Sequence, residues 1–178
     1  GVLYGKKELL EAMPPFLSGG EMISFVSRDG QEYAPLPHKF EAGTVNAAGA
    51  AGLHAAIEYI NSIGFEVIEA REAALTKLAF DAMQKIPGVH IIGGKTAEEH
   101  KGILTFTVEG VHPHDIAAIL DADGVNVRAG NHCAQPLLDH LCTGATARAS
   151  LAFYNSVADV ERFINSLSTI RERMGYGR

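Results

Sequence analysis

The sequence has little of what marks several large classes of protein. Its 178 residues contain two cysteines, Cys133 and Cys142, and a chain of this size does not need a disulfide framework to fold. No apolar run approaches the roughly 20 residues of a membrane-spanning helix. The net charge is −6 and the basic residues form no stripe, which argues against nucleic acid. We therefore expect a protein of the reducing cytoplasm, with no nucleic-acid partner and no membrane partner.

What is present fits a globular protein with a sizeable core. The chain is 47% hydrophobic and 20% charged, and its length suits one domain or slightly more. It begins with GVLYGKK, without methionine, and Val2–Tyr4 is typical of a strand. A chain that starts inside a strand suggests a fragment of a longer protein.

Hydrophobic periodicity and breakers predict the order of elements. The apolar spacing predicts helices over 53–63 and 68–86, whereas residues 16–50 show little periodicity. The remaining expected elements are a strand at 2–4, a helix at 7–13, strands at 89–92 and 103–108, a helix from 113 to Gly124, strands at 125–127 and 146–153, and a last helix after the Ser156/Asp159 capping pattern. From residue 88 this order predicts an α+β fold with a small, mostly antiparallel sheet and helices on one face.

The segment "VRAGNHCAQP", residues 127–136, is the main candidate for chemistry. A free cysteine is often simply a small buried hydrophobe, and that alternative applies to Cys133. Its polar, glycine-containing surroundings between two predicted strands favour an exposed functional loop instead. Arg128 and His132 would make the local potential positive and favour the thiolate, the reactive form of the thiol. Cys142 has less support and is interpreted as incidental.

Arg148 is the second candidate. It lies in "ATARASLAF", where a strand-edge surface position is the plain alternative. An arginine among alanines is also well suited to hold a carboxylate through two parallel hydrogen bonds. The two residues together indicate an arginine that holds a small carboxylate and a thiolate that attacks the bound molecule.

Longer pieces of sequence resemble a known family. "RAGNHCAQP", "ATARASLAFYN", "FEAGTVN" and the initial "GVLYGKKELLEAMPP" are similar to the C-terminal portion of SufS-like, or group II, cysteine desulfurases. These belong to the class V aminotransferases, which are fold-type I pyridoxal-phosphate enzymes. The resemblance covers essentially the whole chain. It implies the C-terminal small domain of such an enzyme, preceded by a long interdomain helix.

The resemblance implies a division of the chain and a reaction. Residues 1–52 would be a remnant of the large cofactor domain with an irregular interface segment, 53–87 linking helices, and 88–178 the small domain. The enzyme would take sulfur from L-cysteine, leave L-alanine, and pass a persulfide to a SUF-type sulfur-acceptor protein for iron–sulfur cluster assembly. A homodimer is implied as well.

The family's residues are matched one by one. The nucleophilic cysteine falls on Cys133, and the carboxylate-binding arginine falls on Arg148. Arg128 and His132 match loop positions beside the substrate. The threonine that reaches the phosphate of pyridoxal 5′-phosphate falls on Thr44.

This chain departs from the family pattern in three ways. The Schiff-base lysine, which the family has in a Ser-x-His-Lys motif, is not in the chain, so we expect the isolated chain to be inactive. Lys39, after His38, only resembles that motif. Val45 replaces the usual proline in Gly-Thr-Pro-Asn, and Asn131 replaces a frequent second histidine.

Other functions are compatible with the same residues. A non-catalytic module could use the surface around Cys133 to bind a sulfur acceptor, and the full-length enzyme could release selenium from selenocysteine. A zinc site could form from His112, His114, His132 and Cys133, although no CxxC or HExxH accompanies them. We expect no metal.

Overall fold

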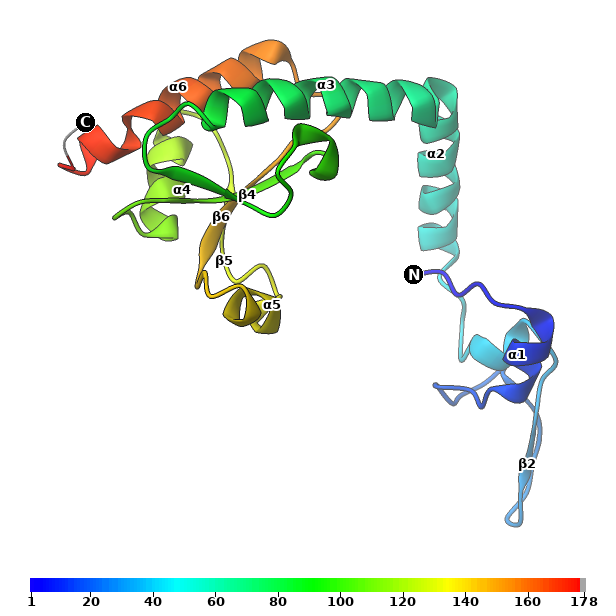
Figure 1. The fold of residues 1–178 in the computed structure, drawn as a ribbon. Coiled ribbons are helices and arrows are strands. Elements are labelled where there is room, and N and C mark those ends of the chain that lie inside the picture. The colour runs from blue at the N-terminus through cyan, green and yellow to red at the C-terminus, as the bar shows by residue number, and fades with distance from the viewer. Residues whose placement is uncertain (177–178) are drawn as a thin grey trace. The chain divides into compact units, whose positions relative to one another are not determined.

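A computed structural model describes residues 1–176 of the chain (Figure 1). The chain divides into two compact units, Gly1–Tyr59 and a second that begins at Ile60. The division expected at residues 52 and 87 stays a prediction. Within 53–87, the side chains of Leu75, Ala79, Phe80 and Met83 belong to the core of the second unit.

The first unit contains short elements. They are α1 (Lys7–Ala12), β1 (Ile23–Val26), β2 (Gln31–Tyr33), the 3-10 helix η1 (His38–Phe40) and most of α2 (Ala47–Ile63). The strand expected at Val2–Tyr4 is absent, because these residues are exposed and pair with no strand. The antiparallel β1–β2 hairpin was not predicted within 16–50, since its strands are only four and three residues long.

Lys39 has a local structural role in the first unit. Its ammonium group donates to the backbone oxygens of Leu10 (3.3 Å) and Glu11 (2.8 Å), near the end of α1. A cation at the C-terminal end of a helix binds the carbonyls that have no partner within the helix. These contacts give Lys39 a structural role at the end of α1.

The second unit is an α+β layer. Its elements are α3 (Phe65–Met83), β3 (Val89–Ile92), η2 (Ala97–Glu99), β4 (Ile103–Val108), α4 (Pro113–Ala122), β5 (Arg128–Gly130), α5 (Gln135–His140), β6 (Thr146–Ser150) and α6 (Val157–Arg173). The four strands form an antiparallel sheet in the order β3-β4-β6-β5. Strands β3 and β4 have the predicted bounds. The strand expected at 125–127 lies instead at 128–130, and α5 was not predicted.

One face of the sheet is covered by α3, α4 and α6 (Figure 1). Alternate residues of β4 and β6 point into this core, with Leu104 opposite Ala149 and Phe106 opposite Ala147. The residues between them point to the other face, where Thr105 lies opposite Arg148. Strand side chains alternate between the two faces, so this register places the polar side chains of β6 away from the helices.

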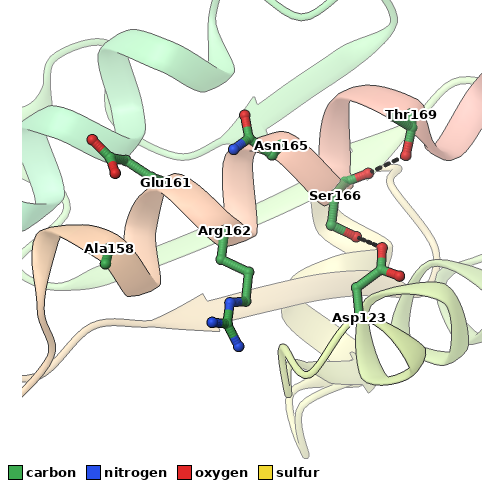
Figure 2. Close-up of a pocket in the computed structure, with 7 residues that line it drawn as sticks. All are labelled: Asp123, Ala158, Glu161, Arg162, Asn165, Ser166 and Thr169. Carbon is green, nitrogen blue, oxygen red and sulfur yellow. Dashed lines mark hydrogen bonds between the residues drawn. The ribbon is translucent and has the colours of Figure 1, made fainter.

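A polar cluster ties α6 to the end of α4. Ser166 donates a hydrogen bond of 2.5 Å to the Asp123 carboxylate, as Figure 2 shows, and Arg173 contacts both carboxylate oxygens, at 2.5 and 3.2 Å. These hydrogen bonds, that of Arg173 first, lower the pKa of Asp123. The shallow groove beside them is lined by α6 side chains such as Arg162 and Asn165. Of its lining residues, Ser166 donates to the Asp123 carboxylate and Thr169 donates to the backbone oxygen of Ser166, which fits a structural role.

Candidate active site

Cys133 lies in a tight turn between β5 and α5. The backbone N–H of Ala134 donates to the carbonyl of Asn131 at 2.8 Å, and the two residues between them, His132 and Cys133, have φ of +53° and +58°. Two successive left-handed residues are typical of a type I′ turn, which glycine and asparagine prefer. Histidine and cysteine in these positions cost about 1 kcal/mol each. Backbone strain of this kind is concentrated at functional sites.

The thiol of Cys133 is exposed and faces a cation. The guanidinium of Arg128 donates to Cys133 Sγ at 3.3 Å. The alternative of a buried structural cysteine is therefore wrong for this residue. A positive charge beside an accessible thiol favours the thiolate, which is the nucleophilic form.

His132 points away from solvent and contacts β6. Its Nε2 lies 2.8 Å from the hydroxyl of Thr146, a residue with no exposed surface. Its Nδ1 is buried and has no hydrogen-bond partner in the described chain. Burial lowers the pKa of His132, the charges of Arg148 and Arg128 lower it further, and a backbone hydrogen bond at Thr146 opposes them. The imidazole is therefore neutral near pH 7.

Arg148 lies beside these groups on the open face of the sheet. In the register of β5 and β6 it is directly opposite Arg128, so both side chains leave the same face. Its Nε is buried and has no hydrogen-bond partner among the described residues. Two cations at directly opposed positions repel each other, and an anion held near them removes that cost. The arrangement suits a small carboxylate near a thiolate.

Four of the five predicted site residues come together in the second unit: Cys133, Arg128, His132 and Arg148. Thr44 belongs to the first unit, in the bend before α2, where it is exposed. The preceding Gly43 has φ +77° and donates to the carbonyl of Gly20 at 2.9 Å. Although Val45 replaces a proline, the turn still leads into α2, because Asn46 accepts from the N–H of Gly49 at 2.8 Å.

The histidines and cysteines of the zinc alternative have other surroundings in the described chain. Residues 1–176 contain no group of three or more histidine, cysteine, aspartate or glutamate side chains placed to hold a metal ion. His112 accepts from the N–H of His114 at the start of α4, and His132 contacts Thr146. Cys142 is an exposed free cysteine with φ +53°, just after α5. In the part of the chain that is described, no helix is both long and apolar enough to cross a lipid bilayer.

The sequence did not predict Thr146 as a site residue. It opens the strand that carries Arg148, and its contact with His132 joins residues 14 positions apart. A threonine in a strand is common, so no local signal distinguishes this one. Only the pairing of Gly130 with Thr146 places the hydroxyl under the turn.

Comparison with known proteins identifies the family. Residues 1–163 match the family described as Aminotransferase class-V. The chain belongs to the class V aminotransferases. It is 49% identical over 175 residues to a probable cysteine desulfurase of Xylella fastidiosa (strain 9a5c), and 47% identical over 175 residues to one of Streptomyces coelicolor. Each match covers 98% of this chain and 42% of the relative.

Solved structures confirm the fold. The cysteine desulfurase CsdA of Escherichia coli matches with a TM-score of 0.87 and 41% sequence identity. A cysteine desulfurase of Thermococcus onnurineus NA1 matches with a TM-score of 0.89 and 39% sequence identity. Each match covers 96% of this chain and 42% of the solved chain. The expectation of a C-terminal α+β portion of this family is therefore confirmed. The chain spans less than half the length of these relatives.

Proposed function

We propose that this chain is the C-terminal part of a SufS-like cysteine desulfurase and that Cys133 is its sulfur-accepting nucleophile. The observation that carries the proposal is the 3.3 Å contact between the Arg128 guanidinium and Cys133 Sγ, on an exposed turn beside Arg148. The similarity to proteins named cysteine desulfurase supports the reaction class.

The chain's own residues have separate tasks in this reaction. Arg148 binds the carboxylate of L-cysteine through its guanidinium, whose Nε is buried and has no hydrogen-bond partner within residues 1–176. Arg128 donates to Cys133 Sγ and so holds this sulfur in place, and the sulfur attacks the substrate sulfur. An S–S bond forms at Cys133 and the C–S bond of the substrate breaks. Its carbon gains a proton, so the products are a Cys133 persulfide and L-alanine.

Pyridoxal 5′-phosphate, when bound, supplies the electron sink that allows the C–S bond to break. Thr44 is the residue of this chain that fits its phosphate, because an exposed hydroxyl beside a left-handed glycine turn can donate to a phosphate oxygen. Lys39 donates to two backbone carbonyls of the first unit and is not assigned to the cofactor. We therefore expect the isolated chain to be inactive.

The partners are proposals of the same kind. An exposed persulfide at Cys133 would be open to a thiol of a SUF-type sulfur acceptor, for iron–sulfur cluster assembly. The first unit leaves large apolar side chains exposed, among them Tyr4, Phe16 and Phe25. Such surfaces are usually covered, which supports a homodimer and packing against the rest of the enzyme. A reducing cytoplasm would keep the thiol available.

The test joins this chain to the N-terminal part of the Xylella relative and measures L-alanine and sulfide from L-cysteine with a thiol reductant. We expect Cys133→Ser to abolish both products and the matched Cys142→Ser to retain them. The isolated 178-residue chain with added cofactor should form neither product. A Cys133→Ser chimaera that keeps its rate would disprove the proposed nucleophile.

A further inference from the structure

The turn that carries Cys133 needs an anchor. His132 and Cys133 both have left-handed backbone conformations that their side chains disfavour, and a single turn hydrogen bond closes the turn. A short exposed loop with this strain relaxes unless the surrounding structure holds it. The thiol meets Arg128 only while the turn keeps this shape, because the side chain of Cys133 leaves the backbone within it.

The contact between His132 and Thr146 is the tie between this turn and the sheet. Thr146 is completely buried in β6 and its backbone pairs with Gly130, the last residue of β5, so its hydroxyl is fixed in position. His132 Nε2 lies 2.8 Å from that hydroxyl. The bond links a strained residue to one of the most rigid parts of the second unit.

We propose that Thr146 is a positioning residue, which holds the ring of His132 through Nε2 and thereby keeps Cys133 against Arg128. The inference rests on the proposed function for its bearing on sulfur transfer, but the positioning itself is a property of this chain. Because Nε2 is engaged, Nδ1 is the ring nitrogen left for a bound polar group.

The hydroxyl is the chemical feature that matters. It can donate to Nε2 or accept from it, so it holds the ring in place whichever ring nitrogen carries the proton. Thr146→Val keeps the shape of the side chain and removes this bond. Thr146→Ser keeps the hydroxyl and is the matched control.

The first test observes the ring directly. ¹⁵N shifts of the His132 ring are measured in the 178-residue chain at pH 7.5 for the wild type, Thr146→Val and Thr146→Ser. We expect the Nε2 shift to be the same in the wild type and in the serine variant, and to move toward that of a nitrogen without a hydrogen-bond partner in the valine variant. Unchanged shifts in Thr146→Val would overturn the proposal.

The second test observes the thiol. In a Cys142→Ser background, the rate of Cys133 alkylation by iodoacetamide at pH 7 is measured for Thr146→Val, His132→Ala and the double variant. We expect each single change to slow alkylation about fivefold, the worth of one hydrogen bond, because Cys133 leaves Arg128. The double variant should be no slower than either single one.

The outcomes separate the possibilities. If Thr146→Val and His132→Ala slow alkylation by independent factors that multiply, or if Thr146→Val leaves the rate unchanged, Thr146 does not act through His132. His132→Ala removes the same hydrogen bond from the side of the turn. If Thr146→Val folds poorly, the alkylation rate of His132→Ala against the wild type still tests whether this bond positions Cys133. Neither test needs the cofactor or L-cysteine, so failure of the desulfurase proposal would leave these results intact.

Discussion

Arg128 on β5 and Arg148 on β6 lie directly opposite each other in an antiparallel register, and their side chains leave the same face of the sheet. Two guanidinium groups in this arrangement destabilise the sheet unless an anion accompanies them. Arg128 contacts the thiol of Cys133, whereas Arg148 keeps a buried nitrogen that has no hydrogen-bond partner in the described part of the chain. Under the proposed function, Arg128 would serve the sulfur of Cys133 and Arg148 would serve a substrate carboxylate.

Replacement of Arg148 by lysine tests the carboxylate assignment. Lysine keeps the charge but has no planar fork of donors, so a carboxylate bound through two parallel bonds is held less well. In the chimaeric enzyme we expect KM for L-cysteine to rise about tenfold or more with Arg148→Lys, and further with Arg148→Gln. Steady-state kinetics measure this. Equal KM values for the wild type and Arg148→Gln would remove Arg148 from substrate binding.

Replacement of Arg128 tests the contact with the thiol. In a Cys142→Ser background, Arg128→Gln should slow iodoacetamide alkylation of Cys133 at pH 7 by about tenfold, because the thiolate loses its adjacent cation. Arg128→Lys should retain part of the rate. Arg162→Gln, which changes an exposed arginine on α6, is the matched control and should have no effect. Equal slowing by Arg162→Gln would point to net charge alone.

His132 makes stability depend on pH. Because burial and two arginines lower its folded-state pKa, the unfolded chain binds the proton more tightly than the folded chain does. Stability should therefore fall as the pH drops below the ordinary histidine pKa of about 6.5, until the folded-state pKa is passed. Thermal denaturation between pH 8 and pH 5 should show a smaller loss of Tm for His132→Gln than for the wild type. The same slope in both would contradict a lowered pKa.

Gly102, just before β4, tests the packing where the inner strands β4 and β6 meet the loops that flank them. It has φ +82°, and a Cβ added there would lie 2.9 Å from the backbone oxygen of Leu151. Gly102→Ala should destabilise the chain by about 2 kcal/mol or more, because neither the conformation nor the backbone contact can relax easily. Gly144 has φ +65° with no neighbouring atom within 4 Å, so Gly144→Ala should cost only about 1 kcal/mol. Urea denaturation measures both, and equal losses would show that the contact is unimportant.

Much of the second unit could be predicted from local patterns. The alternation of Leu104, Phe106 and Val108 with threonines predicts β4 with the observed bounds, because one face of that strand is buried and the other is not. The Ser156/Asp159 pattern likewise predicts the start of α6, where each side chain bonds the other's backbone. Prediction failed for short elements such as the β1–β2 hairpin and α5, because they contain too few residues to show a hydrophobic periodicity.

By itself the sequence determined the order of the longer strands and helices, the family motifs, and the residues Cys133, Arg128, His132 and Arg148 as candidates. These follow from residue type and spacing along the chain. Only the tertiary structure decided which of them meet. The pairing of β5 with β6 places Arg128 opposite Arg148 and brings Thr146 under His132, 14 residues away. Strand register is fixed by packing of the whole sheet, so no local pattern contains that contact.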